Sequence, residues 1–195
     1  MLAYLSWHRP AATVEAGAYE QALERFHRSL AHQRPCGFRG SASFRAPLLA
    51  WLAAPEGAGG GYEDWYLLED WAAVGVLEEA AVSRGHHGAH ERIAARAGSA
   101  TSAIYRLVEG GAELGAARVA VWVSRAPGRE RPSLETLLAD GIEPSTGSLW
   151  RRCLGLGPAP EFCLLAAEEP DGAAPARLPH GWSAAVHPRE LLWHG

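Results

Sequence analysis

Three histidines within five residues, His86, His87 and His90, form the densest group of potential metal ligands in the chain. On a helix, the first and the last of them would share a face at i, i+4 spacing, which can hold a zinc ion. Gly85 and Gly88 interrupt such a helix, and no Cys or Asp stands beside the group. A loop followed by a helix start is therefore the favoured interpretation, and a metal site at these histidines is the third hypothesis for function. In the first turn, His90 would be a neutral imidazole that could accept a proton.

Polar and aromatic side chains also alternate along four expected strands, so that each strand presents them on one face. The first strand carries Tyr4, Ser6 and His8, and the second carries Arg39, Ser41, Ser43 and Arg45. The third strand offers either Tyr62, Asp64 and Tyr66 or Glu63, Trp65 and Leu67, and the fourth offers Tyr105 or Arg106. Such a face could bind a small anionic or aromatic molecule. The alternative is a face that is simply wet, as is common in antiparallel sheets.

From this set we select the candidates for chemistry. The proton-handling candidates are His8, His90 and Tyr105, because imidazole and phenol groups can act as general acids or bases. The ligand-binding candidates are Arg39, Arg45, Trp65, Tyr66 and Arg106. No cofactor is expected.

Several function classes are excluded by what the sequence lacks. All 18 basic residues are Arg, and the absence of Lys excludes Schiff-base chemistry and a phosphate-loop lysine. There is no Gly-x-Ser-x-Gly elbow and no Cys-x-x-Cys pair. The glycines of 57–61 precede an expected strand, whereas phosphate-binding glycines follow a strand and open a helix.

Bulk composition narrows the setting. The net charge of −4, with no run of more than two Arg, argues against a nucleic-acid partner. No apolar stretch is long enough for a membrane span, and the apolar start of the chain stops at once in His8-Arg9-Pro10, which is unlike a signal peptide. The low, odd count of three Cys suits a reducing cytoplasm. The richness in Ala, Gly and Arg is typical of a GC-rich bacterial genome.

Residues 1–111 are expected to form a βαββαβ unit, the ferredoxin-like arrangement. Strands are predicted at 2–8, 38–45, 62–69 and 101–108, and helices at 15–32, 70–82 and 89–97. The clearest helix is 15–32, where Tyr19, Leu23, Phe26 and Leu30 recur at helical spacing. A loop is expected at 47–61.

Residues 112–195 are expected to repeat the unit in a degraded form. Strands are predicted at 117–125, 148–156 and 161–168, with a short helix at 133–139. The second helix is replaced by a loop at 170–180, and a strand or irregular tail covers 181–193. The segment Val123-Ser124-Arg125-Ala126-Pro127 is similar to Leu5-Ser6-Trp7-His8-Arg9-Pro10, and 161–168 is similar to 63–69. The fold class is therefore α+β, with two halves in one compact unit.

This organisation resembles the dimeric α+β barrel superfamily in its fused, single-chain form. The resemblance rests on the Tyr-Leu-Ser-Trp-His strand, the long helix after it, the Glu-Asp-Trp-Tyr-Leu-Leu-Glu strand and their echoes in the second half. Relatives include antibiotic-biosynthesis monooxygenases, muconolactone isomerases, EthD-like and NIPSNAP-like proteins and haem-binding chlorite dismutases. The resemblance implies a ligand cleft between sheet and helices. Haem members use a His on a second-half helix, and the expected helix at 133–139 has none.

Two interpretations of function follow. The first is a cytoplasmic barrel protein with a small-molecule pocket; as an enzyme it would oxygenate or isomerise an aromatic or polyketide-like compound without a cofactor. The second is a non-enzymatic assembly protein, in which exposed sheet edges pair two chains as a homodimer.

Overall fold

The N-terminal part of the chain supplies four strands and three helices. The structure is a computed structural model, and it describes residues 1–47, 49–53, 59–83, 86–126, 128, 147–168 and 178–195. The elements in order are β1 (Leu2–Pro10), α1 (Ala16–His32), β2 (Phe38–Ala46), β3 (Gly61–Leu68), α2 (Trp71–Ser83), α3 (His87–Ala94) and β4 (Ala97–Gly110). The last helix and strand begin earlier than the sequence suggested, because the chain leaves α3 directly into β4.

The described residues of the C-terminal part form mainly strands. They are β5 (Val119–Arg125), β6 (Ser148–Gly155), β7 (Phe162–Ala166), β8 (Trp182–Pro188) and β9 (Glu190–His194), with a short 3-10 turn, η1 (Leu114–Ala116), before them. The expected tail at 181–193 is thus two strands. The helix expected at 133–139 and most of the loop expected at 170–180 lie outside the described residues.

Helix α1 forms because one of its faces is apolar and its start is capped. The Glu15 carboxylate accepts hydrogen bonds from the backbone N–H groups of Gly17 (2.9 Å) and Ala18 (2.8 Å), which would otherwise lack partners. Its buried residues recur every three to four positions and face the sheet: Tyr19, Ala22, Leu23, Phe26, His27 and Leu30. Among the helices that the structure describes, none is long and apolar enough to cross a membrane.

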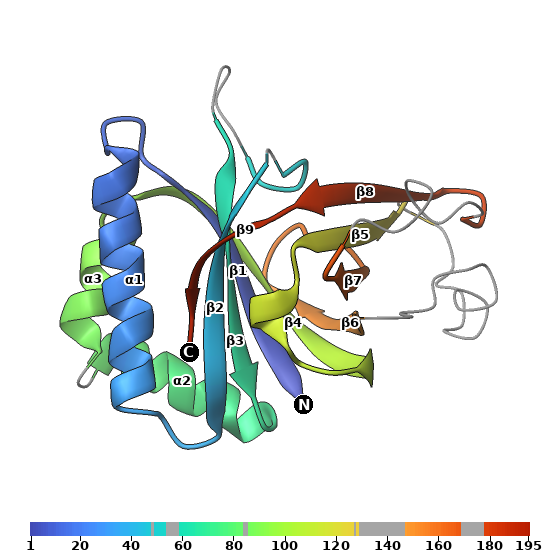
Figure 1. Ribbon diagram of the computed structural model, residues 1–195. Coiled ribbons are helices and arrows are strands. Elements are labelled where there is room, and N and C mark those ends of the chain that lie inside the picture. Colours follow the sequence, from blue (N-terminus) through green and yellow to red (C-terminus); the bar gives the residue numbers. More distant parts are fainter. Residues whose placement is uncertain (48, 54–58, 84–85, 127, 129–146, 169–177) are drawn as a thin grey trace.

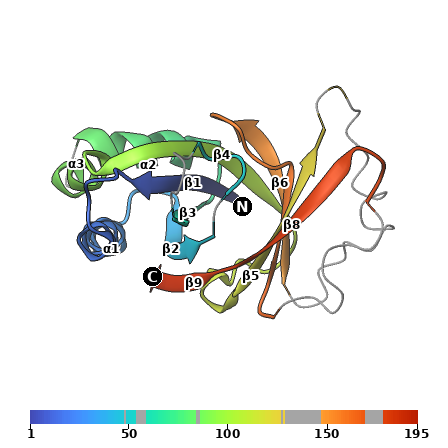
Figure 2. The same ribbon diagram turned by 90° about the horizontal axis from the view of Figure 1, so that it is seen from above.

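The nine strands that the structure describes form one sheet in the order β8-β5-β7-β6-β4-β1-β3-β2-β9, and every neighbouring pair is antiparallel. The sheet curls, with helices α1, α2 and α3 together against the outer face of β1 to β4 (Figure 1; Figure 2). Within the sheet, β8-β5-β7-β6 repeats the relative order of β4-β1-β3-β2.

The C-terminal segment joins the two edges of this sheet. Strand β8 pairs with β5 at one edge, and β9 pairs with β2 at the other. Only Arg189 separates these two strands, and its backbone N–H donates to the carbonyl of Arg118 (2.7 Å). Figure 2 shows the segment passing from one side of the curled sheet to the other. The segment β8–β9 therefore links the two edges of the curled sheet.

The inside of the curl is packed with aromatic side chains. Trp7, Trp65, Trp122 and Trp150 are all buried there, and each alternates with a neighbour that points to the outer face. Their rings meet edge to face, with centroids 5.2 Å apart for Trp7 and Trp122 and 5.3 Å apart for Trp65 and Trp150. The bulky rings supply the core volume that an Ala-rich chain otherwise lacks.

One ion pair is enclosed by these rings. The Nε of Arg189 lies 3.1 Å from Oε1 of Glu63, and both side chains are inaccessible to solvent. The indole N–H groups of Trp65 (2.6 Å) and Trp7 (3.2 Å) also donate to this carboxylate. The guanidinium lies over the ring of Phe44, 3.5 Å from its centroid. Burial lowers the pKa of Arg189, an effect that the Glu63 carboxylate opposes.

Candidate functional site

A pocket of about 370 Å³ lies between the outer face of the sheet and the three helices. The sheet contributes Tyr4, Ser6, His8, Asp64, Tyr66, Ala97 and Ala100, and the helices contribute Tyr19, Leu23, Phe26, Leu77, Glu78, Ala81, His90, Ile93 and Ala94. Aromatic and aliphatic walls with a few convergent polar groups are typical of a small-molecule site.

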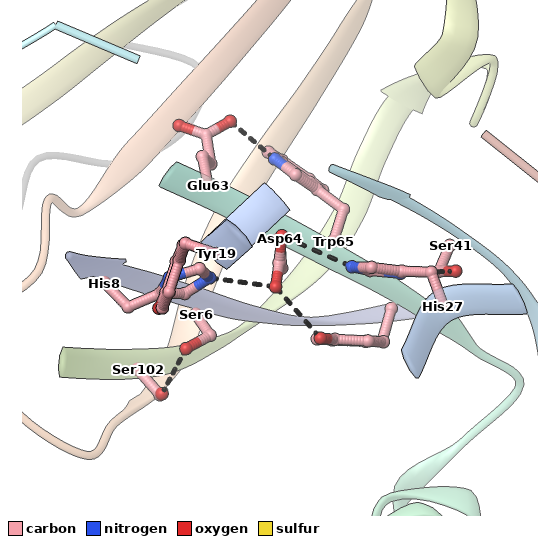
Figure 3. A network of polar contacts seen from close by, with 10 residues as sticks. Ser6, His8, Tyr19, His27, Ser41, Glu63, Asp64, Trp65 and Ser102 are labelled. Atoms are coloured by element: carbon pink, nitrogen blue, oxygen red, sulfur yellow. Dashed lines mark hydrogen bonds and ion pairs between the residues drawn. The ribbon is translucent and has the colours of Figure 1, made fainter. Parts of the chain in front are cut away.

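The pocket is built around the buried carboxylate of Asp64. This residue lies on β3 opposite Ser6 of β1, on the face that the helices cover. Its Oδ2 is 2.9 Å from Nε2 of His8 and accepts a hydrogen bond from the hydroxyl of Tyr66 (3.1 Å). Figure 3 shows the carboxylate between His8 and His27. Two strands and one helix thus hold the carboxylate in place.

His8 links this carboxylate to a second phenol. Its Nδ1 lies 2.7 Å from the hydroxyl oxygen of Tyr19, which comes from α1, and its ring stacks on Tyr62 at 5.8 Å. With Asp64 ionised, a neutral His8 carries its proton on Nε2 and donates it to the carboxylate. Nδ1 is then the acceptor for the Tyr19 hydroxyl. The order Tyr19–His8–Asp64 is a chain of donors that points from the pocket into the protein.

His27 approaches Asp64 from the other side. Its Nε2 is 3.3 Å from Oδ1, a contact that is electrostatic because its geometry falls short of a hydrogen bond. Its Nδ1 lies 2.8 Å from the Ser41 hydroxyl, and its ring stacks on Tyr66 at 5.1 Å. The side chain is fully buried. His27 therefore orients the carboxylate from behind and does not line the pocket.

The electrostatics of the group keep a fixed negative charge beside His8. Burial alone would raise the pKa of Asp64, but His8 and His27 together hold it well below its usual range. Burial raises the pKa of Tyr19, and the Asp64 charge adds to this. The pKa of Tyr66 is raised for the same two reasons. Both phenols stay protonated, so the Asp64 carboxylate is the negative charge of the group, and it lies next to the His8 ring.

The residues selected from the sequence lie in three places. His8, Tyr66 and His90 line the pocket. His90 contacts the ring of Phe26 (centroids 5.5 Å apart). Tyr105 and Trp65 point the other way, into the barrel. The Tyr105 hydroxyl donates to the carbonyl of Pro160 (2.7 Å), and burial raises its pKa. The alternation of β4 and β3 places these two side chains away from the helices.

The selected arginines lie outside the pocket. Arg39 forms an ion pair with Glu69, and Arg106 is exposed on β4. Arg45 holds both carboxylate oxygens of Glu20 (2.6 and 2.7 Å) and also pairs with Glu190. It borders a separate open groove of about 1010 Å³. Arg39 and Arg45 are thus neutralised by acidic residues of the chain itself.

Replacing Arg45 with Ala is expected to change stability little. Its side chain is 43% exposed, and exposed ion pairs contribute at most about 1 kcal/mol. Urea unfolding would measure this difference, and it should shrink further at high salt because exposed charges are screened. A loss well above this range would mean that the pairing of α1, β2 and β9 through Arg45 is a major support of the fold.

The histidine cluster does not converge on a point. His86 lies between Ser29 (3.1 Å) and the carbonyl of Gln33 (3.0 Å), where it fastens the start of α3 to the end of α1. His87 faces Glu91, and His90 faces the pocket. Within the part of the chain that the structure describes, no three His, Cys, Asp or Glu side chains are placed to hold a metal ion.

Sequence reasoning did not select Asp64, Tyr19 or His27. A signal existed for the two helical residues, because they lie eight positions apart on the buried face of α1. Tyr19 was nevertheless assigned to the apolar stripe of the helix, and His27 was given no role. For Asp64, the alternation of β3 left open which face of the strand meets the helices. Every position of this strand is buried, so the polarity of its residues did not distinguish the two faces.

Comparison with known proteins identifies the fold. No family model and no curated protein sequence matches the chain. Among solved structures, an anthrone oxidase-like protein superposes with a TM-score of 0.57 at 10% identity, covering 100% of this chain and 92% of its own. A chlorite dismutase-type protein gives a TM-score of 0.39 at 14% identity, covering 85% and 78%. The chain therefore shares the overall fold of the anthrone oxidase-like protein, an α+β barrel-type fold.

Proposed function

We propose that the protein is a cofactor-free enzyme that binds a small aromatic hydroxy or keto compound in the helix–sheet pocket and removes a proton from it. The observation that carries this proposal is the buried Asp64 carboxylate, joined through His8 to the Tyr19 hydroxyl at the pocket wall. A buried charge costs stability unless it is compensated, and such groups concentrate at sites of proton transfer.

The proton transfer runs through Tyr19. Both ring nitrogens of His8 have partners, so the group that meets the ligand is the Tyr19 hydroxyl. The ligand proton passes to the Tyr19 oxygen while the hydroxyl proton of Tyr19 passes to Nδ1 of His8. Tyr19 ends unchanged, His8 becomes an imidazolium, and the Asp64 carboxylate stabilises its charge. The ligand is left as an enolate or phenolate, which can regain a proton at another atom and so isomerise.

The walls of the pocket support an aromatic ligand. Phe26, Tyr66 and Leu23 offer flat or apolar surface, which favours a ring over a sugar or a peptide. The name of the anthrone oxidase-like protein suggests a convenient probe. Anthrone is an aromatic ketone with an acidic methylene group, and loss of one proton gives an aromatic enolate. In air this enolate could react with O₂, giving anthraquinone and one water per anthrone.

The test is exchange of the anthrone methylene protons in D₂O under nitrogen, followed by NMR. The wild-type protein should accelerate exchange, and His8→Gln should lower the protein-dependent rate by about 100-fold, the usual contribution of a general base. Tyr19→Phe should cost less, because Nδ1 of His8 becomes free to accept the proton directly.

His87→Gln is the matched control, since this exposed histidine faces Glu91 and does not line the pocket. Its exchange rate should equal that of the wild type. Equal rates for His8→Gln and the wild type would refute the proposed proton acceptor. Oxygen uptake in a parallel aerobic sample separates oxygenation from simple enolisation.

We infer further that the sheet consists of two ferredoxin-like repeats, 1–111 and 112–195. The equal strand orders β4-β1-β3-β2 and β8-β5-β7-β6 support this. A homodimer remains a prediction, and it is not needed to bring two halves together. The cytoplasm is the proposed location, supported by Cys36, Cys153 and Cys163, which are all free thiols.

A further inference from the structure

We propose that the pocket has a second polar end, formed by Tyr4 and Glu78, and that it selects fused-ring aromatic ligands with a hydroxyl group at each end. The inference rests on the proposed function in one respect, because it assumes that the ligand occupies this same pocket. It adds the shape and substitution pattern of the ligand, which the proton relay alone does not define.

The two ends are set by the register of β1. Tyr4, Ser6 and His8 alternate on the face that the helices cover, and Tyr4 and His8 lie ~13 Å apart along the strand. The His8 end is deep, because its side chain is only 7% exposed. Tyr19 from the start of α1 and Ile93 from the end of α3 line the pocket at this end.

The Tyr4 end has a different chemistry and opens to solvent. The Tyr4 hydroxyl interacts with the side chains of Ser102 and Glu78, and burial together with Glu78 raises its pKa. Glu78 is exposed on α2 and lines the pocket. Its carboxylate can accept a hydrogen bond from a ligand hydroxyl, and hydrogen bonds to a charged acceptor are the stronger kind.

Small side chains make room between the two ends. Ser6 lies opposite Ser102 on β4, and the two hydroxyl oxygens are 3.4 Å apart. Figure 3 shows this pair beside His8 and Tyr19. The Tyr19 hydroxyl lies at one end of this space and the Glu78 carboxylate at the other, since both line the pocket from different helices. A single ring with one hydroxyl would reach only one end, whereas two or three fused rings with terminal oxygens reach both.

The test compares two probes that differ by one hydroxyl, 2-naphthol and 2,6-dihydroxynaphthalene, by calorimetric titration. The wild-type protein should bind the diol about tenfold more tightly, as expected for one hydrogen bond to a charged group. In Glu78→Ala this ratio should fall close to one, with the affinity for 2-naphthol nearly unchanged. Tyr4→Phe should lower the ratio part of the way.

Glu79→Ala is the control, because it removes the same charge from the adjacent position of α2 and lies outside the pocket lining. It should keep the wild-type ratio. If Glu78→Ala and the wild type had the same ratio of affinities for the two probes, the second polar end would be refuted. The proton relay would not be affected by that result. Failure of both probes to bind would overturn the pocket itself. Normal binding with no anthrone exchange would refute only the relay.

Discussion

Replacement of Asp64 with Ala should lower the free energy of unfolding by about 3–5 kcal/mol, the usual cost of breaking a buried ion pair by removing one partner. The carboxylate is shared by His8 and His27 and accepts from Tyr66, and all three partners lose a buried contact at once. The same variant should lose protein-dependent anthrone exchange, since nothing then stabilises the His8 imidazolium.

Urea unfolding at neutral pH gives the stability change directly. Asp70→Ala serves as the matched control, because this carboxylate accepts one hydrogen bond from the backbone of Ala73 (3.0 Å) near the start of α2. Loss of such a cap costs about 1 kcal/mol. If both variants lost the same small free energy of unfolding, the Asp64 network would contribute no more to stability than an exposed helix cap does.

The same residue predicts a pH dependence. The pKa of Asp64 is lower in the folded protein than in the unfolded chain, so the unfolded chain binds the proton first as the pH falls. Its stabilising contribution is therefore complete above the ordinary carboxyl pKa of about 4 and is lost below it. The urea midpoint of the wild type should fall more steeply between pH 5 and pH 3 than that of Asp64→Asn. Equal slopes would contradict this account.

Replacement of Glu63 with Ala should have a comparable effect on the barrel interior. Arg189 would keep its buried guanidinium with no opposite charge near it, and Trp7 and Trp65 would lose the acceptor for their indole N–H groups. We expect a loss of about 3–5 kcal/mol, measured by the same unfolding experiment.

A double variant separates the charge from the packing. Glu63→Leu together with Arg189→Met replaces the pair with apolar side chains, and such exchanges are often neutral or stabilising. The double variant should be more stable than Glu63→Ala alone. If it were less stable, then the pair would be required for the packing of the rings around it, including the contact of Arg189 with Phe44.

Local patterns in the sequence predicted most of the elements. The helical spacing of Tyr19, Leu23 and Phe26 is visible because one face of α1 is exposed and the other is buried. The alternation in β2 is visible in the residue types, although of its positions only Arg39 and Arg45 are exposed. The sequence did not predict that the C-terminal tail divides into β8 and β9. The division occurs at Arg189, where the chain passes from one sheet edge to the other, and it depends on pairing with distant strands.

The candidate site was predicted only in part. His8 and Tyr66 were selected, and both line the pocket. Trp65 and Tyr105 were selected on chemical type, but their orientation depends on which face of each strand meets the helices. That choice is made by packing between elements far apart in the chain. Arg39 and Arg45 read as free cations because their partners, Glu69, Glu20 and Glu190, come from other elements.

The strand that joins both sheet edges has a consequence for the order of folding. Pairs between β1, β2, β3 and β4 form within one continuous stretch of chain, whereas Ala42 must find His194 to pair β2 with β9. The entropic cost of closing so long a loop delays contacts of this kind. The helix-covered side, which carries the pocket, can gain its contacts early, and sealing of the tryptophan-filled interior then becomes the slow step of refolding.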